Sequence, residues 1–201
     1  MAHSPATSAI PKAVLRAEAL QRRDELDART RSAGSDAIAG RALPLILAEK
    51  PKAVSFYWPI RSEVDPRPLL AGVRQAGVAI ALPVLMDATT LHFREWLPGA
   101  DLVPAGFGTR GPGVEAPEVV PDVIVLPLAG FDRAGHRIGY GKGHYDRAVA
   151  ALHAKSLRPL LIGLAFSVQE VSRVPAEPHD IRLDVIVTER EALDFRKGQD
   201  G

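Results

Sequence analysis

The stretch from residue 122 to residue 152 constrains the possible fold more than any other part of the sequence. Residues 122–128 read Asp-Val-Ile-Val-Leu-Pro-Leu, an apolar and β-branched run that is typical of a strand buried on both faces. A glycine-rich segment follows, and residues 145–152 are rich in helix formers. A strand, a glycine-rich loop and a helix N-terminus in this order often bind phosphate, because the helix dipole and the first N–H groups point at the ligand.

The glycine-rich segment, residues 139–147, reads Gly-Tyr-Gly-Lys-Gly-His-Tyr-Asp-Arg. Three alternating glycines remove Cβ atoms from the backbone, so its N–H groups can form a concave nest for an anion. Lys142 adds a mobile positive charge, and Asp146 is an oxygen ligand suited to Mg²⁺. His144 stands where a dinucleotide fingerprint has its third glycine, and the sequence has no P-loop pattern. We favour phosphate binding over a tight turn that only tolerates glycine.

Composition and charge narrow the class of protein. The chain has 201 residues, 46% of them hydrophobic and 24% charged, which suits one domain over residues 1–201. A net charge of +1 with both signs spread along the chain argues against nucleic acid and anionic membranes as partners. The absence of cysteine excludes disulfides, thiolate metal sites and a cysteine nucleophile. Without a secretory pattern or a stretch that could span a bilayer, we expect a soluble, cytoplasmic protein. We also expect it to be a monomer.

Hydrophobic patterns predict alternating helices and strands. An amphipathic helix is expected over residues 11–31 and ended by Gly34, and a second over residues 35–49, kinked or ended early by Pro44. Other helices are expected at residues 66–75, 145–152 and 168–173, and strands at residues 53–58, 78–84, 91–96, 122–128, 159–166 and 183–188. This order favours a three-layer α/β domain with a largely parallel central sheet flanked by helices. Its ligands would lie at the carboxyl ends of the strands.

Three segments fall outside this alternation. Residues 98–121 are rich in glycine and proline and too long for an ordinary connection. We expect a binding loop there, with plain disorder as the alternative. Residues 1–10 are expected to be disordered, and residues 190–201 to form a C-terminal tail.

The glycine loop belongs to a longer motif. Residues 127–147 read Pro-Leu-Ala-Gly-Phe-Asp-Arg-Ala-Gly-His-Arg-Ile followed by the loop itself. This motif resembles the signature of 5-formyltetrahydrofolate cyclo-ligase, also called methenyltetrahydrofolate synthetase. Further landmarks follow in the family's order: Lys12-x-x-x-Arg16, Glu63 after a strand, Gly-Leu-Ala-Phe-x-x-Gln at residues 163–169, and His-Asp-x-x-x-Asp-x-Ile-Val-Thr-Glu at residues 179–189. The resemblance therefore spans nearly the whole chain.

The resemblance implies an ATP-dependent and Mg²⁺-dependent ring closure. In that reaction 5-formyltetrahydrofolate becomes 5,10-methenyltetrahydrofolate, with release of ADP and phosphate, through a phosphorylated formyl group that N10 then attacks. Such chemistry needs positioning and charge stabilisation rather than an enzyme nucleophile, so the lack of cysteine is no obstacle. ATP as co-substrate, Mg²⁺ and the folate are the implied small-molecule partners.

The resemblance also implies a set of site residues. Catalytic roles fall to Lys142, His144 and Tyr145. ATP would be bound by Lys12, Arg16, Arg137, Gly139, Tyr140, Gly141, Lys142, Gly143, Tyr145 and Asp146. The folate would be bound by Glu63 through its pterin, and by Phe56 or Tyr57, Phe107 and His144 through stacking. Asp146 and Asp180 would hold Mg²⁺.

Several of these residues also have an ordinary structural interpretation. Lys12 and Arg16 share one helical face, which can simply be solvated. Asp146 and Glu63 can be charges near helix N-termini, and Asp180 a turn residue.

Two loop residues depart from the family pattern. His144 stands where many members have an aromatic residue, and Tyr140 where some have arginine. We hypothesise that His144 tunes the pH profile, whereas simple space filling is the alternative.

Two other functions stay open at this point. One is a nucleotide-binding or folate-binding module without turnover. The other is a sugar-phosphate isomerase of related fold, which would need neither ATP nor Mg²⁺ and so fits the Lys12/Arg16 and Asp146/Asp180 pairs less well.

Overall fold

The structure is a computed structural model that describes residues 10–87, 89–106 and 108–196. The expectation of disorder at residues 1–10 falls outside this part, apart from residue 10. The helices are α1 (Lys12–Asp24), α2 (Ala28–Ala48), α3 (Arg67–Gln75), α4 (His144–Ala154) and a short 3₁₀ helix, η1 (Ser167–Gln169). The main strands are β1 (Ala53–Ser55), β2 (Ala79–Leu85), β3 (Leu91–Glu95), β6 (Val123–Pro127), β9 (Leu160–Leu164), β10 (Val185–Val187) and β11 (Ala192–Asp194).

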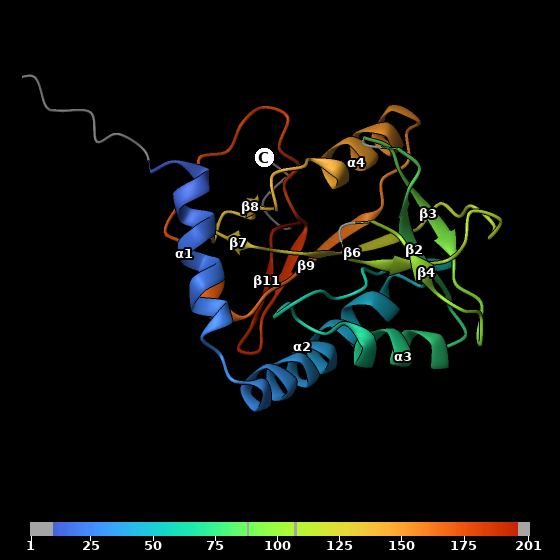
Figure 1. The fold of residues 1–201 in the computed structure, drawn as a ribbon, viewed down its shortest axis with the longest axis horizontal. Coiled ribbons are helices and arrows are strands. Elements are labelled where there is room, and N and C mark those ends of the chain that lie inside the picture. Colours follow the sequence, from blue (N-terminus) through green and yellow to red (C-terminus); the bar gives the residue numbers. More distant parts are fainter. Residues whose placement is uncertain (1–9, 88, 107, 197–201) are drawn as a thin grey trace, which may run out of the picture.

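These main strands form one seven-stranded sheet in the order β11-β10-β9-β6-β1-β2-β3. The five inner strands are parallel, and the two edge strands, β3 and β11, pair antiparallel with their neighbours. Helices α2 and α3 cover one face and α4 covers the other, as Figure 1 shows. The predicted α/β architecture with a largely parallel central sheet is confirmed.

The sequence of β6 explains why both faces of the sheet are covered. Val123 and Val125 pack in the cluster beneath α2 and α3, whereas Ile124 and Leu126 pack in the cluster beneath α4. Successive side chains of a strand point to opposite faces, so an unbroken apolar run produces a strand buried on both sides. The prediction made from residues 122–128 is therefore confirmed.

The break between the first two helices differs from the prediction. Helix α1 ends at Asp24, and Asp27 starts α2 by accepting a hydrogen bond from the backbone N–H of Thr30 at 2.8 Å. Gly34 does not end a helix but lies inside α2, where an added Cβ would be 2.8 Å from the Phe166 ring. Pro44 also lies within α2. The close packing of the Phe166 ring, rather than helix termination, explains why a glycine stands at position 34.

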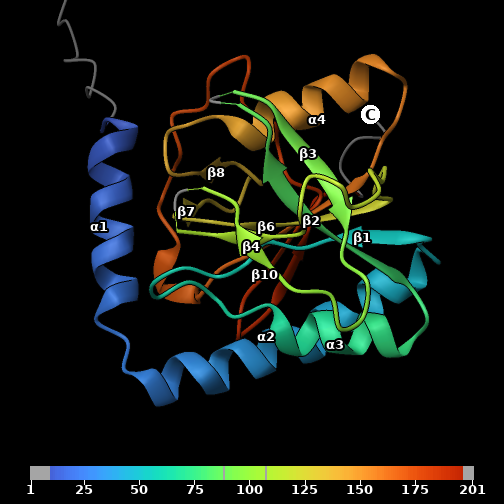
Figure 2. The ribbon, with the colours of Figure 1, turned by 45° about the vertical axis from the view of Figure 1, so that its right-hand side comes forward.

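Helix α1 stands apart from the other helices. Figures 1 and 2 both show it at one end of the sheet and at a steep angle to α2. It contacts η1 and the small hairpin of β7 (Gly130–Phe131) and β8 (Arg137–Ile138). This hairpin lies between β6 and the glycine loop, so the strand does not lead into the loop directly. The sequence did not predict the hairpin.

The remaining differences concern three segments. The helix expected at residues 168–173 is only η1, and residues 192–194 of the expected tail form β11. The long segment 98–121 carries a small hairpin of β4 (Val103–Pro104) and β5 (Arg110–Gly111). It then runs beside β3, where the N–H of Val119 donates to the carbonyl of Phe93 at 2.9 Å and the N–H of Glu95 donates to that of Pro117 at 2.8 Å.

Two glycines provide a matched test of core packing. A Cβ at Gly163 would lie 2.6 Å from Leu183 Cδ1 and 2.8 Å from Leu128 Cδ1, whereas a Cβ at the exposed Gly40 would meet nothing within 4 Å. We expect Gly163→Ala to lower the free energy of unfolding by about 1–3 kcal/mol through overpacking. Gly40→Ala, inside α2, should raise it by roughly 0.5–1 kcal/mol. Urea titration measures both, and equal effects would contradict the packing argument.

Candidate active site

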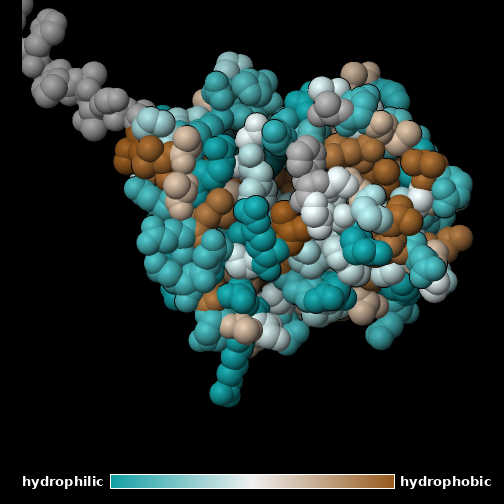
Figure 3. Space-filling view, viewed as in Figure 1, coloured by the Kyte–Doolittle hydropathy of each residue, from teal (hydrophilic) through white to brown (hydrophobic). Residues whose placement is uncertain are grey.

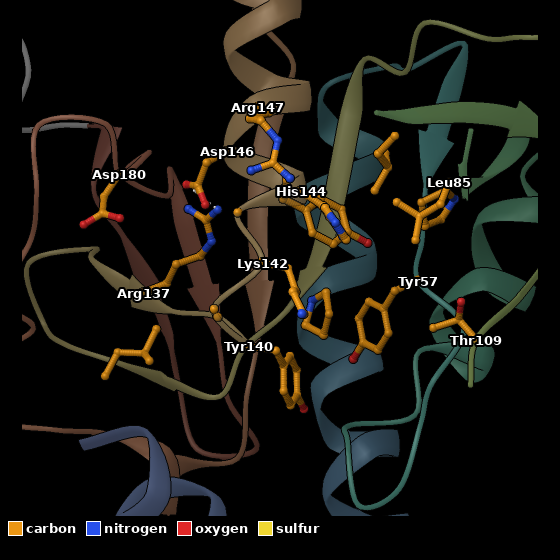
Figure 4. A pocket seen from close by; sticks show the side chains of 18 of the residues that line it. Tyr57, Leu85, Thr109, Arg137, Tyr140, Lys142, His144, Asp146, Arg147 and Asp180 are labelled. Atoms are coloured by element: carbon orange, nitrogen blue, oxygen red, sulfur yellow. Dashed lines mark hydrogen bonds and ion pairs between the residues drawn. The ribbon is translucent and has the colours of Figure 1, made fainter. Parts of the chain in front are cut away.

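A pocket of about 1000 Å³ opens at the carboxyl ends of β1, β2 and β6. This is the edge at which ligands of parallel sheets are expected. Of the predicted site residues that the structure describes, all line it except Phe56. Figure 4 shows Arg137, Lys142 and Asp180 on one side of it and Leu85 and Thr109 on the other.

The two sides of the pocket differ in character. Four basic side chains surround one end of the pocket: Lys12, Arg16, Arg137 and Lys142. Apolar side chains line the other end: Pro83, Leu85, Leu91 and Ala105. In Figure 3 hydrophilic residues dominate the side of the molecule that carries α1, whereas hydrophobic residues gather on the opposite side. The pocket therefore suits a ligand or ligand pair with an anionic part and an apolar part.

The glycine loop has the backbone conformation that its sequence predicts. Gly141 and Gly143 have φ angles of 85° and 64°, in the left-handed region that favours glycine. Gly143 is the N-cap of α4, so the first N–H groups and the positive dipole end of that helix lie beside the loop. Arg16 donates from Nε to the carbonyl of Gly139 at 2.6 Å. The loop thus offers backbone donors and a cation at one end of the pocket.

Lys12, in the first turn of α1, forms an ion-pair cluster with residues 177–180 of the segment between η1 and β10. Its ammonium lies 3.0 Å from Glu177 Oε2 and forms a shorter contact with Asp180 Oδ2. Burial lowers the pKa of Lys12, but the hydrogen bonds to Asp180 and Glu177 outweigh it, so that pKa is raised. Burial likewise raises the pKa of Asp180, and the hydrogen bond from Lys12 brings it below the ordinary value. Both groups are therefore charged at neutral pH.

Arg137 and Asp146 connect the glycine loop to the same segment. Arg137 Nη2 donates to Asp146 Oδ1 at 2.8 Å, and Arg137 Nη1 donates to the carbonyl of Ile181. The backbone N–H of Ile181 donates to Asp146 Oδ1 at 3.2 Å. Asp146 uses one carboxylate oxygen for both contacts, so its position is defined from two directions.

The acidic side chains near this end have the chemistry of a site for a hard cation. Asp146 and Asp180 lie on the same side of the pocket in Figure 4. Ligand atoms of Glu177, His179 and Asp180 lie within 4.8 Å of one another. Carboxylate oxygens are the ligands that Mg²⁺ prefers, so the residues present fit this ion.

Glu63 is a buried carboxylate at the other end of the pocket. Its side chain belongs to a residue only 8% exposed, and its Oε2 accepts the backbone N–H of Ile60 at 2.9 Å. Burial raises the pKa of Glu63 despite opposing contributions from the Ile60 N–H, the Tyr140 hydroxyl and Arg23. A carboxylate of this kind is typical of a ligand-recognition site, because a ligand that donates two N–H groups would compensate its burial.

The aromatic residues predicted to stack on the folate fall into three cases. Phe56 is fully buried in the core beneath α2 and α3 and is not part of the pocket wall, so the prediction for Phe56 is wrong. Tyr57 lines the pocket, although its hydroxyl donates to the carbonyl of Val64 at 2.7 Å and burial raises its pKa. Phe107 lies outside the described residues. Sequence alone does not say which face of the chain Phe56 uses just after β1 ends.

His144 and Tyr145 open helix α4 and both line the pocket. Burial raises the pKa of the Tyr145 hydroxyl well above its ordinary value. That hydroxyl is therefore protonated at neutral pH and can serve as a hydrogen-bond donor but not as a base.

Several pocket residues were not predicted. Trp58 packs edge-to-face against Trp96, with ring centroids 5.8 Å apart, and lines the pocket beside Tyr57. Arg61 and Arg147 also line it. Ala105 and Thr109 come from segment 98–121, which supports the expectation of a binding loop there. No motif marks these residues, because they reach the pocket through the sheet order rather than through neighbouring sequence.

The fold and the pocket together define an α/β protein with a phosphate-type glycine loop at the carboxyl edge of a parallel sheet and an apolar compartment beside it. The sequence profile of the 5-formyltetrahydrofolate cyclo-ligase family matches residues 9–189. The chain belongs to this family, and the prediction of a ligase-family enzyme is confirmed.

Relatives agree over most of the chain. It is 30% identical over 180 residues to the 5-formyltetrahydrofolate cyclo-ligase of Haemophilus influenzae, covering 86% of this chain and 95% of that one. The solution structure of 5,10-methenyltetrahydrofolate synthetase from Aquifex aeolicus is similar, with a TM-score of 0.80, 32% identity and 96% coverage of both chains. The Mycoplasma pneumoniae synthetase structure shares the fold, with a TM-score of 0.73, 24% identity, and coverage of 90% of this chain and 99% of that one.

Among the described residues, no helix has both the length and the apolar character needed to cross a membrane. The expected cytoplasmic location and monomeric state stay predictions.

Proposed function

We propose that this protein converts 5-formyltetrahydrofolate into 5,10-methenyltetrahydrofolate at the expense of ATP, with ADP and phosphate as the other products. The observation that carries the proposal is the pocket itself. It joins a glycine loop surrounded by four basic side chains to a compartment that holds the buried carboxylate of Glu63. Two dissimilar ligands, one polyanionic and one a flat heterocycle with N–H donors, fit these two ends. Family membership supports the same reaction.

At the basic end, the backbone from Gly139 to Gly143 would hold the ATP phosphates together with Lys12, Arg16 and Arg137. Arg16 already contacts the loop at Gly139, and the N-terminus of α4 adds its dipole. Tyr140 and Tyr145 would contact the nucleotide from either side of the loop. The arrangement stabilises the charge of the phosphates before any chemistry begins.

Phosphoryl transfer would then follow from the positioning of the formyl oxygen next to the γ-phosphate of ATP. The formyl oxygen attacks the γ-phosphorus, and the bond to the ADP oxygen breaks. N10 next attacks the activated formyl carbon, its proton is lost, and the carbon–oxygen bond breaks to release phosphate. Lys142 neutralises charge on the transferred group, while Tyr145 donates a hydrogen bond and His144 stacks near N10.

Asp146 and Asp180 are the proposed Mg²⁺ ligands. Bound there, Mg²⁺ would supply charge neutralisation to the ATP phosphates. Arg137 and the Ile181 N–H hold Asp146, and Lys12 holds Asp180, so both carboxylates are oriented beforehand.

At the other end, Glu63 would accept paired N–H bonds from the aminopyrimidinone edge of the pterin. Tyr57 and Trp58 lie on the adjoining wall and would contact the rings. Ala105 and Thr109 would contact the folate from segment 98–121.

The direct test mixes purified protein, 5-formyltetrahydrofolate and MgATP. We expect near-ultraviolet absorbance of the methenyl product to rise, with one ADP formed per product, and to stay flat when ATP or Mg²⁺ is omitted. Binding of both ligands without product would instead indicate a module that has lost turnover. Turnover of a sugar phosphate without ATP would indicate an isomerase.

Asp146→Asn tests the metal assignment. We expect the Mg²⁺ concentration for half-maximal activity to rise about tenfold or more, because an amide is a weaker ligand than a carboxylate. The Mg²⁺ dependence of the ATP-induced shift in Tm should weaken in parallel, which is a readout independent of turnover. Asp36→Asn, at an exposed position on α2, is the control. Full Mg²⁺-dependent activity in the Asp146 variant would overturn the assignment.

A further inference from the structure

Arg23 in α1 is a charged side chain with almost no contact with solvent. It is 2% exposed and is among the largest fully buried side chains of the described residues. Its Nη1 donates to the Tyr140 hydroxyl at 2.7 Å and its Nε donates to the Ser62 hydroxyl at 3.0 Å. The carboxylate of Asp24 lies 3.6 Å from Arg23 Nη2 and is largely exposed.

This burial needs an explanation beyond anchoring a helix. Removing a guanidinium from water is costly, and the contact with the exposed Asp24, together with the charge of Glu63 beyond ion-pair distance, compensates that cost only in part. An apolar side chain at position 23 would anchor α1 at lower cost. The charge of Arg23 is instead directed at two hydroxyls: that of Tyr140, which lines the pocket in the glycine loop, and that of Ser62, which adjoins the pocket residue Glu63.

The two partners of Arg23 belong to the two proposed subsites. Tyr140 lies in the glycine loop, between Gly139 and Gly141. Ser62 immediately precedes Glu63, and its own hydroxyl contacts Asp24. The Glu63 carboxylate is close enough to the Tyr140 hydroxyl to help raise its pKa, so the hydroxyl that Arg23 contacts lies near Glu63. A continuous chain of hydrogen bonds therefore joins α1, the loop and the turn that carries Glu63.

We propose that Arg23 is a positioning residue that holds the glycine loop and the Glu63 turn in one fixed arrangement, so that the ATP and folate subsites are organised together. The inference rests on the proposed function for the identity of the two ligands. It adds that both subsites are held in place by the same side chain, Arg23, through its hydrogen bonds. Weakening that support must then weaken the binding of both ligands, although Arg23 itself does not line the pocket.

The test measures equilibrium binding of each ligand separately by calorimetry, with 5-formyltetrahydrofolate alone and with a non-hydrolysable ATP analogue alone. Tyr140→Phe keeps the ring and Arg23 but removes the shared hydroxyl. We expect a rise of about tenfold in the folate Kd, the size expected for loss of a hydrogen bond to a charged group. The Kd of the ATP analogue should rise as well. Arg23→Met should raise both Kd values, and Arg23→Lys should recover part of the loss.

The double variant separates positioning from general damage. If Arg23 acts through Tyr140, adding Tyr140→Phe to Arg23→Met should cost little more than Arg23→Met alone. Arg22→Lys is the matched control, because Arg22 anchors the same helix to the carbonyls of Val168 and Glu170 without lining the pocket. It should alter Tm with both Kd values unchanged.

The outcomes are distinguishable. Unchanged Kd values in Tyr140→Phe, or an effect confined to one ligand, would overturn the inference. If Arg23→Met does not fold, Tyr140→Phe still tests the inference, because this variant retains Arg23. If the unmodified protein binds neither ligand, the proposed function fails instead.

Discussion

Replacing Lys142 with methionine is expected to lower kcat by about 10²–10³-fold, the range seen when a group that stabilises transition-state charge is removed. Lys142 lies on the glycine loop at the pocket (Figure 4) and would face the phosphoryl group during transfer. The folate KM should change little, because Glu63 and the apolar wall are untouched. Steady-state kinetics with each substrate varied in turn measures both quantities.

Two control variants accompany this prediction. Lys142→Arg retains the positive charge and should recover much of kcat. Lys155→Met removes an exposed lysine just after the end of α4 and should have no effect. A Lys142→Met enzyme with normal kcat but a raised ATP KM would show that Lys142 contributes to ground-state binding alone.

Glu63→Gln should raise the folate KM by about 10–100-fold, because an amide cannot accept the paired N–H bonds that an ionised carboxylate accepts. ATP binding should be nearly unchanged, since glutamine can still accept the Ile60 N–H and stay in place. Isothermal calorimetry with each ligand measures the two affinities. Equal loss of both would indicate that the substitution disturbs the turn itself.

The burial of Glu63 adds a pH dependence. Burial raises its folded-state pKa above the ordinary 4.5, so folate affinity should fall as pH drops through this raised pKa. The Gln variant should lack that decline. A carboxyl with a raised folded-state pKa favours folding below its unfolded pKa and loses that contribution as pH rises. At pH 7, Glu63→Gln should therefore have a higher Tm than the unmodified protein, with the difference vanishing below pH 4.5.

Sequence predicted the parts of the fold that periodicity and burial determine. The run at residues 122–128 is typical of a strand buried on both faces, and β6 has that place in the sheet. The pocket was predictable from the same reasoning, because parallel strands align their carboxyl ends at one edge. The glycine loop was predictable since positive φ angles at Gly141 and Gly143 require the residue type found there.

Features that depend on tertiary contacts were not predictable. Gly34 was interpreted as a helix terminator because glycine often is one, yet the Phe166 ring occupies the space its side chain would need. Phe56 was predicted as an alternative to Tyr57 for stacking on the folate rings, although its side chain packs in the core. In the sequence, Arg23 is one of several charged residues on a predicted amphipathic helix. The burial of Arg23 becomes evident only in the structure, where α1 packs against the glycine loop and the turn that carries Glu63.

The course of segment 112–120 has a consequence for the solution behaviour of the protein. Edge strands with exposed N–H and C=O groups invite pairing between two molecules. Along β3 these groups are engaged by the chain itself, through Val119, Pro117 and the bridge between Arg94 and Glu118. The loop that contributes Ala105 and Thr109 to the pocket thus also shields the β3 edge of the sheet from edge-to-edge pairing, a role that is independent of catalysis.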